Sequence, residues 1–459
     1  MTASDPRHDA TPFHALLRRV VDVERREVGA LVISFATFFA LLCAYYLIRP
    51  VRDEISASVT SEMRHQLFSV VFVVMLIAVP LFGWLVSRYP RERVLPAVYG
   101  FFIATLAVFW FLLINGKQDV ALWAWHDAKG AQQTFSIAAG FFVWGSVFNL
   151  FVVSLFWILM SELWSSEQAK RLYGFLAAGG TAGAFTGPLI AQTLATMIRP
   201  TNLLIIAGVL LTVAMLLAVA LRRRYAATAS VADTTKPAVT MRDLVAGAEH
   251  VWHSPYLFRI AMWVLIANII GTFFYLEQSE IIGRTITDKA LRVQFLARLD
   301  LTVSVLTIIL QLVGTGWFMS RLGVGWAAGA LPCVATLGLV ALSVAPTLLV
   351  VATVLAAERT MAFALSSPAI KVMYTVVEPE EKYKAQNFID TVVYRGGDAV
   401  SGWIMGGLGR DGLGLSITTI AAASVPLALV WLALSHNLGA RQAEKAAAQG
   451  GAPSSAAGH

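Results

Sequence analysis

The sequence predicts an all-α, polytopic membrane protein with twelve transmembrane helices in two halves of six. Three observations lead there: a very apolar composition, a series of hydrophobic stretches of membrane-spanning length, and a short repeat at matching places in the halves. Of the 459 residues, 57% are hydrophobic and 14% are charged, whereas about 25% of residues are charged in soluble domains. This composition excludes a soluble enzyme, a disordered chain and a nucleic-acid-binding module.

The hydrophobic stretches have the length that a transmembrane helix requires, which is about 20 residues for roughly 30 Å of hydrocarbon. The twelve candidates are 28–48, 67–87, 94–114, 136–160, 172–197, 202–221, 257–280, 300–319, 324–344, 347–367, 388–409 and 415–435. Two of them, 172–197 and 388–409, contain more glycine and polar residues than the others.

Polar segments divide the chain into regions. Apolar residues at helical spacing among arginines predict an amphipathic helix on the cytoplasmic membrane face within 1–27. The longest polar stretch, 222–256, predicts a cytoplasmic linker between an N-terminal half, 28–221, and a C-terminal half, 257–435. The tail 436–459, rich in Ala, Gly, Gln and Ser, predicts disorder.

Lysine and arginine are distributed unevenly between alternate loops. With both termini inside, the cytoplasmic segments carry 21 of these residues and the outer loops 11. Because cytoplasmic loops are enriched in Lys and Arg, both termini are expected in the cytoplasm. The acidic residues within 1–27 argue against a transit peptide, and we expect the inner membrane of a bacterium.

A short repeat supports an internal duplication. Gly83-Trp84-Leu85-Val86-Ser87-Arg88 follows the second stretch, and Gly316-Trp317-Phe318-Met319-Ser320-Arg321 follows the eighth. One copy alone would be explained by a generic basic inner loop. Two six-helix halves with a cytoplasmic linker resemble the major facilitator superfamily, and the region after Gly83 is similar to its loop 2–3 signature. This resemblance implies transport by alternating access, with the substrate bound near the membrane midplane.

Charged residues within or beside the spans are candidates for the transport site, because a charge at mid-bilayer costs about 2.5–3.5 kcal/mol. Arg49, Arg52 and Asp53 follow the first span. If the helix continues there, Arg49 shares a face with both Arg52 and Asp53. Two guanidinium groups on a cavity wall suit a phosphate, which arginine binds bidentately. An ordinary polar helix end is the alternative.

Glu277 and Glu280 end the seventh span, at the counterpart place in the second half. These carboxylates could hold Arg49 or Arg52 in one conformation, or take up a proton. A solvated helix end is again the alternative.

Two further groups lie in later spans. Glu358 and Arg359, in the middle of 347–367, are interpreted as an ion pair that either fixes helix packing or takes part in gating. Asp390, Arg395 and Asp398 lie in 388–409. Their spacing allows Arg395 and Asp398, but not all three, to share one stripe, and structural and functional roles both stay open.

Other patterns point to packing and away from enzymatic chemistry. Gly179, Gly183 and Gly187 recur every four residues, a spacing that lets membrane helices approach closely. No Walker A loop appears and the eight histidines are scattered, so we expect no enzyme activity, no cofactor and no metal site.

Several stretches resemble the non-mitochondrial ATP/ADP antiporters. They are Leu47-Ile48-Arg49-Pro50-Val51-Arg52-Asp53, then Phe156-Trp157 with Glu167-Gln168-Ala169-Lys170-Arg171-Leu172-Tyr173-Gly174, and then Lys382-Tyr383-Lys384 with Ile389-Asp390-Thr391-Val392, Arg395 and Gly396-Gly397. The resemblance implies nucleotide exchange, with Arg52 at a basic position and Glu277, or Glu280, at an acidic one. The sequence departs from the family at 141–160, which contains no carboxylate, and at Asp398, which stands where the family has a lysine.

We therefore predict a secondary-active transporter that exchanges nucleotide-like, phosphate-bearing anions such as ATP and ADP. The expected substrate-binding residues are Arg49, Arg52 and Arg395, and the expected gating or coupling residues are Asp53, Glu277, Glu280, Glu358, Arg359, Asp390 and Asp398. The alternatives are a proton-coupled transporter of another solute or organic anion, and a membrane component that does not transport. The expected partners are a small anion and the lipid bilayer, without nucleic acid, and the expected state is a monomer.

Overall fold

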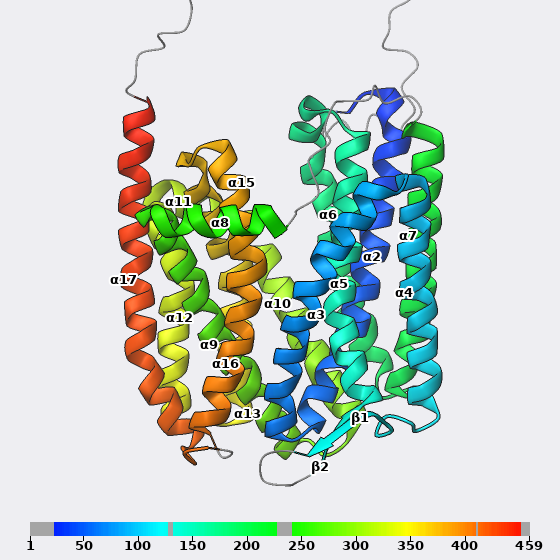
Figure 1. Cartoon of the computed structure of the whole chain (residues 1–459), viewed down its shortest axis with the longest axis vertical. Coiled ribbons are helices and arrows are strands. Elements are labelled where there is room, and N and C mark those ends of the chain that lie inside the picture. The colour runs from blue at the N-terminus through cyan, green and yellow to red at the C-terminus, as the bar shows by residue number, and fades with distance from the viewer. Residues whose placement is uncertain (1–22, 127–131, 227–240, 410–411, 451–459) are drawn as a thin grey trace, which may run out of the picture. The chain divides into compact units, whose positions relative to one another are not determined.

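The computed structural model describes residues 23–126, 132–226, 241–409 and 412–450. Eleven helical segments in this part of the chain are long and apolar enough to cross a membrane. The prediction of an all-α, polytopic membrane protein is thereby confirmed (Figure 1). Backbone contacts divide the chain into two compact units, each of which combines segments that are distant in sequence.

The first unit comprises Met1–Val51, Leu85–Ile137 and Phe148–Lys236. Its described elements are α2 (Arg25–Ser58) as far as Val51, α4 (Arg91–Ile114), most of α5 (Ile137–Leu163), α6 (Ser166–Leu194), α7 (Leu203–Leu221), the 3-10 turn η1 (Pro200–Asn202), the π turn η2 (Arg222–Ala226), β1 (Ala121–His126) and β2 (Gln132–Ser136).

The glycine spacing in α6 brings this helix close to α2. A Cβ atom at Gly183 would overlap the carbonyl oxygen of Phe39 and would lie 2.9 Å from the backbone nitrogen of Cys43. One at Gly187 would lie 2.7 Å from the Cys43 carbonyl oxygen. The glycines therefore leave the space that the α2 backbone occupies, and the packing role expected for them is confirmed.

The start of α6 is fixed to the same helix by polar contacts. Ser165 caps α6 in a capping box with Gln168, which satisfies backbone groups at the helix start. Gln168 and Arg171 then bind the carboxylate of Glu27 on α2, with 2.6 Å between Arg171 Nη2 and Glu27 Oε1. The capping box and this ion pair therefore hold the polar end of α6 against α2.

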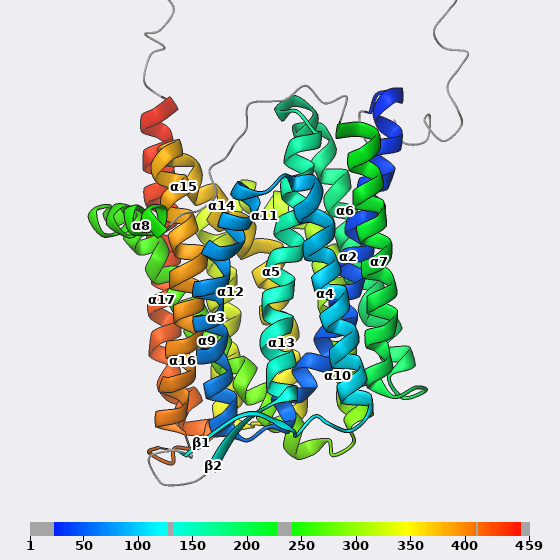
Figure 2. The same ribbon diagram turned by 45° about the vertical axis from the view of Figure 1, so that its right-hand side comes forward.

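A small antiparallel hairpin, β1–β2, joins α4 to α5 (Figure 2). The all-α prediction did not include this hairpin. Trp123 pairs across it with Phe135, and such aromatic cross-strand pairs stabilise strands. Leu122 and Trp123 are nevertheless exposed.

The second unit comprises Arg52–Trp84, Ala138–Val147 and Pro237–His459. It includes the end of α2 from Arg52 and the part of α5 from Ala138 to Val147. Its other described helices are α3 (Ser61–Arg88, as far as Trp84), α8 (Met241–His253), α9 (Pro255–Thr285), α10 (Lys289–Val313), α11 (Thr315–Leu322), α12 (Val324–Val344), α13 (Leu348–Met361), α14 (Ser367–Met373), α15 (Pro379–Phe388), α16 (Tyr394–Leu408) and α17 (Ile417–Gly450), with the turns η3 (Ala362–Ser366), η4 (Tyr374–Val376) and η5 (Ile389–Val393).

The core of this unit lies where α9, α12 and α17 run side by side (Figure 1). The indole rings of Trp263 and Trp431 are 5.3 Å apart between centroids. The Trp263 indole donates a hydrogen bond of 2.8 Å to the Ser435 hydroxyl, so this buried polar group is satisfied without water.

One predicted span is less apolar than the others, and the predicted start of the tail is wrong. The stretch 388–409 is helical in η5 and α16 but is not among the eleven apolar segments, since its glycines and charged residues lower its hydropathy. Disorder from 436 onward is wrong as far as Gly450, because α17 continues to that residue and Ala, Gln, Glu, Lys and Arg all favour helix. Most of the amphipathic segment expected within 1–27 lies outside the described residues.

Candidate functional site

The charged group after the first span lies on a continuous helix, because α2 runs through Pro50 to Ser58. Arg52 pairs with its neighbour Asp53, with 2.7 Å between Nη2 and Oδ1. The hydroxyl of Tyr275 on α9 donates a hydrogen bond of 3.1 Å to the same Asp53 oxygen. Arg49 belongs to the first unit, where its guanidinium lies 5.7 Å from the centre of the Tyr46 ring.

Aromatic side chains surround Arg52. Its guanidinium lies 5.1 Å from the centre of the Phe142 ring on α5, and Phe68 on α3 contacts the rings of both Phe142 and Tyr275. A Cβ atom on Gly145 would lie 3.0 Å from Arg52 Cδ. A glycine on α5 thus leaves room for the arginine stem, and the rings lower the polarity around its charge.

A second guanidinium–carboxylate pair lies on α16. Arg395 Nη1 is 3.5 Å from Asp398 Oδ2, so these two residues do share a stripe. The Thr272 hydroxyl donates a hydrogen bond of 3.3 Å to Asp398, and the Arg395 guanidinium lies 5.3 Å from the centre of the Tyr394 ring. Asp390 lies in η5 and does not join the pair.

One face of α9 contacts both arginine–aspartate pairs, Arg52–Asp53 and Arg395–Asp398. Asn268, Thr272 and Tyr275 follow the spacing that places side chains on one side of a helix. Tyr275 reaches Asp53 and Thr272 reaches Asp398, while a Cβ atom on Gly397 would lie 3.2 Å from Asn268 Cβ. This polar face of α9 carries the candidate substrate site. In that site Asp53 neutralises Arg52, and Asp398 neutralises Arg395.

A third set of charges lies where α2 turns into α3, and it centres on Arg64. This side chain is 4% exposed and donates hydrogen bonds to the carbonyl oxygens of Ser56 at 2.8 Å, Val59 at 3.1 Å and Leu276 at 3.4 Å. Its Nη1 also lies 3.7 Å from Glu280 Oε2. Arg64 therefore binds the end of α2 and reaches a carboxylate on α9.

Arg292 does the same at the turn from α9 into α10. It donates hydrogen bonds to the carbonyl oxygens of Ile286 at 2.6 Å and Thr287 at 3.4 Å. Its Nη1 binds Glu54 Oε1 at 3.3 Å and the Ser58 hydroxyl at 2.7 Å. We call Arg64–Glu280 and Arg292–Glu54 the crossed ion pairs. Sequence reasoning missed Arg64 and Arg292 and gave no role to Glu54, which ends the charged run after the first span, because each resembles an ordinary charge near a helix end.

The two turns also meet through small residues. The hydroxyls of Ser56 and Ser279 are 3.2 Å apart. Glu280 pairs with Arg284 as well as Arg64, and not with Arg49 or Arg52 as the sequence suggested. Glu277 is 8% exposed, and its Oε2 atom has no hydrogen-bond partner among the described residues.

The prediction of a Glu358–Arg359 ion pair is wrong. Arg359 on α13 instead binds Asp300 on α10, with 2.8 Å between Nη2 and Oδ1, and Asp300 is 3% exposed. Arg359 thus turns towards α10 and away from its neighbour Glu358. Sequence reasoning missed Asp300 because the eighth span was expected to begin there, whereas α10 begins at Lys289 and places Asp300 in its middle.

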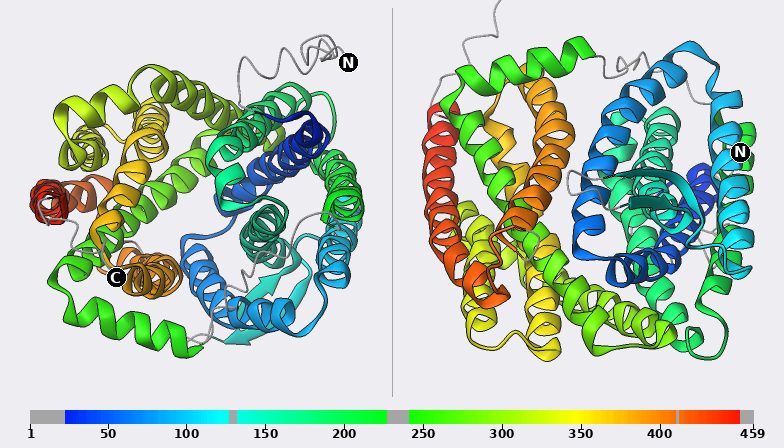
Figure 3. Two further views of the ribbon diagram at one scale, coloured as in Figure 1. Left: turned by 90° about the horizontal axis from the view of Figure 1, so that it is seen from above. Right: turned by 60° about the horizontal axis from the view of Figure 1, so that its bottom comes forward.

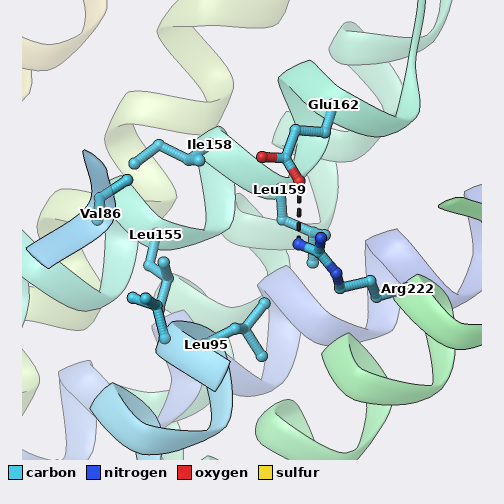
Figure 4. Close-up of a pocket in the computed structure, with 8 residues that line it drawn as sticks. Val86, Leu95, Leu155, Ile158, Leu159, Glu162 and Arg222 are labelled. Carbon is cyan, nitrogen blue, oxygen red and sulfur yellow. Dashed lines mark hydrogen bonds and ion pairs between the residues drawn. The ribbon is translucent and has the colours of Figure 1, made fainter. Parts of the chain in front are cut away.

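The first unit contains a separate small pocket (Figure 4). It is lined by Val86, Val94, Leu95, Leu155, Ile158, Leu159, Glu162 and Arg222. Its polar groups are one ion pair, with 3.1 Å between Arg222 Nη1 and Glu162 Oε2. These mostly aliphatic walls do not suit a polar anion, and none of the expected site residues lines them. No group of His, Cys, Asp or Glu in the described part of the chain has the arrangement of a metal site.

Comparisons with known proteins place this geometry in a family. Residues 30–402 match the model of the Major Facilitator Superfamily. No curated protein matches the chain. Among solved structures, a POT family transporter in complex with a thioalcohol-conjugated peptide is 11% identical, with a TM-score of 0.60 over 89% of this chain and 96% of that one.

Two other solved structures are similar. A bacterial homologue of the iron transporter ferroportin is 13% identical, with a TM-score of 0.61 over 92% of this chain and 99% of that one. A bacterial homologue of the human lysosomal transporter Spinster is 11% identical, with a TM-score of 0.55 over 93% and 98%. At these identities the likeness shows the fold alone, and the resemblance to ATP/ADP antiporters stays a prediction. The family match shows that this multi-pass membrane protein belongs to the major facilitator superfamily and is a secondary transporter, not an enzyme.

Proposed function

We propose that this chain exchanges small organic anions by alternating access, and that nucleotide-like phosphate anions are the first class to test. The observation that carries the proposal is the pair of arginine–aspartate contacts, Arg52–Asp53 and Arg395–Asp398, joined by the polar face of α9. Ionised residues within membrane-spanning helices are costly and mark substrate or ion pathways.

Substrate binding would replace one counterion by another. In the empty site Asp53 neutralises Arg52, and Asp398 neutralises Arg395. A phosphate group offers each guanidinium the same bidentate contact as a carboxylate. Arg49, which belongs to the first unit, stays a separate candidate for substrate binding. The rings of Phe68, Phe142 and Tyr275 offer faces on which a planar base stacks.

The crossed ion pairs supply a gate for such a cycle. Arg64–Glu280 and Arg292–Glu54 stabilise the conformation in which the α2–α3 turn contacts the α9–α10 turn. Both pairs must break when these turns separate. The uneven distribution of Lys and Arg supports a cytoplasmic location for both termini, which would place this gate at the outer face of a bacterial inner membrane.

Counterflow in proteoliposomes tests the proposal. Vesicles loaded with unlabelled ADP should take up labelled ATP, and uptake should fall to background without internal nucleotide and in Arg52→Ala. Arg298→Ala, which removes an exposed arginine of α10, is the matched control and should keep wild-type uptake. Absence of exchange for ATP, ADP and a panel of other organic anions, with folded and inserted protein, would overturn the proposal.

A second candidate function is proton-coupled transport of another solute. It is favoured by Glu277, a buried carboxylate with one oxygen that lacks a hydrogen-bond partner in the described part of the chain, and by Asp398 at the place of a lysine in the antiporter family. Carboxylates of this kind form proton relays in transporters. A protonophore should abolish uptake for this function, and Glu277→Gln should uncouple it while counterflow continues. Anion exchange should survive both treatments.

A further inference from the structure

Helix α8 comes directly before α9 and uses one face to pack on the second unit. Val251 on this face is buried in the hydrophobic core of the unit. A Cβ atom on Gly247 would overlap the Lys384 carbonyl oxygen on α15 and would lie 2.8 Å from Phe388 Cβ. A larger residue at Gly247 would therefore push α8 away from α15.

The opposite face of α8 is apolar and exposed. Val245 is 68% exposed and Trp252 is 77% exposed, and their spacing of seven places both on one side of the helix. The Trp252 ring meets the Phe258 ring edge to face, with 6.0 Å between centroids. Phe258 lies on the first turn of α9 and is also exposed. The exposed face of α8 is thus continuous with the outer surface of a membrane-spanning helix.

The direction of α8 differs from that of its neighbours. It runs across the direction of α9 and α16 (Figure 1) and lies at the edge of its unit when seen along the helices (Figure 3). Glu249 is exposed on one flank of the apolar face, and Ala248 lies on the other. This arrangement is that of an amphipathic helix in the plane of a membrane surface.

We infer that α8 lies in the headgroup layer of the bilayer and that Val245 and Trp252 contact lipid. Tryptophan is enriched at this depth, where its ring is apolar and its N–H stays near water. Arg259, directly after the first turn of α9, adds a positive charge at the same level for anionic headgroups. The continuity with Phe258 favours lipid over a protein partner, because a membrane covers the outer surface of α9 as well.

This contact would connect the lipid surface to the candidate site. α8 packs on α15, and α15 leads through η5 into α16, which carries Arg395 and Asp398. Lipid composition at the headgroup level thereby acts on the helix that holds one of the two candidate substrate arginines.

Depth-dependent quenching tests the inference without using transport. In a Cys43→Ala/Cys333→Ala background, Trp252→Cys is labelled with an environment-sensitive fluorophore in proteoliposomes of phosphatidylcholine and phosphatidylglycerol. Quenching by a nitroxide near the headgroup should exceed quenching by a nitroxide deep in the acyl chain by about twofold or more. Val245→Cys, on the same face, should report the same depth and guards against a folding defect specific to Trp252.

Two exposed positions on α17 serve as controls. A label at Ala446→Cys, beyond the apolar part of the helix, should be quenched by aqueous iodide, and one at Leu429→Cys by the deep nitroxide. Quenching of the α8 labels by iodide as strongly as at position 446 would overturn the inference. Protection from both lipid and iodide would overturn it as well, and would indicate a second copy or another protein on this face.

Discussion

Arg64 and Arg292 are internal equivalents. Arg64 on α3 binds carbonyl oxygens at the end of α2 and pairs with Glu280 on α9. Arg292 on α10 binds carbonyl oxygens at the end of α9 and pairs with Glu54 on α2. Their separation in sequence matches, within a few residues, that between the two Gly-Trp repeats. The contact is self-complementary, like the interface of a twofold dimer, in which the same pair occurs twice, and this is what the predicted duplication would produce.

A cross-link should fix this contact. Ser56 and Ser279 have hydroxyls 3.2 Å apart, so cysteines at these positions would have neighbouring sulfur atoms, as a disulfide requires. In a Cys43→Ala/Cys333→Ala background, oxidised Ser56→Cys/Ser279→Cys should lose nearly all transport, and reduction should restore it. The loss is expected because the α2–α3 and α9–α10 turns could no longer separate.

Either single cysteine variant should transport normally under the same oxidant. Formation of the disulfide in gel assays with full transport would show that these turns stay together throughout the cycle. That result would remove the crossed ion pairs from the gate.

The Arg359–Asp300 pair should behave as a structural contact. Asp300→Leu alone should destabilise the protein by about 3–5 kcal/mol, since it leaves a buried guanidinium without its carboxylate. Asp300→Leu/Arg359→Met should recover most of this loss, because replacing both charges by apolar groups is often neutral. Thermal unfolding in detergent measures both effects, and transport by the double variant separates packing from gating. A double variant that is stable but inactive would instead give the pair a role in transport.

Removing the carboxylate beside Arg395 should strengthen anion binding. Asp398→Asn keeps a side-chain partner for Thr272 but no longer competes for the guanidinium, so KM should fall by about tenfold, or ~1.4 kcal/mol. Asp390→Asn, which changes a carboxylate outside the pair, is the matched control and should leave KM unchanged. A higher KM in Asp398→Asn would contradict the exchange of counterions proposed for this site.

The contact between α2 and α6 should not tolerate a methyl group at its centre. Gly183→Ala should lower stability by about 1–3 kcal/mol, because the new atom meets the α2 backbone, which cannot turn aside as a side chain can. Gly174→Ala on the same helix meets nothing within 4 Å and should be neutral or slightly stabilising. Equal thermal stability of the two variants would show that α6 can shift away from α2 at little cost.

The helices could be predicted from the sequence more readily than the ion pairs between them. Composition alone predicts the spans, whereas an ion pair such as Arg64–Glu280 joins residues whose proximity no local pattern reveals. The Glu358–Arg359 prediction relied on adjacency in the chain, and the actual partner, Asp300, lies on another helix. The internal repeat held only a partial signal, since its offset of 233 residues places Glu54 seven residues beyond Glu280 and Arg64 five residues beyond Arg292.

The extension of α17 has a practical consequence for imaging. Its 34 residues span about 50 Å at 1.5 Å per residue, while the hydrocarbon layer is only about 30 Å thick. A soluble helical protein could be fused so that its first helix continues the last turns of α17. It would then project as a rigid marker from the detergent micelle. Such a marker would give particles of this 49.7-kDa chain the asymmetry that alignment in electron cryomicroscopy requires.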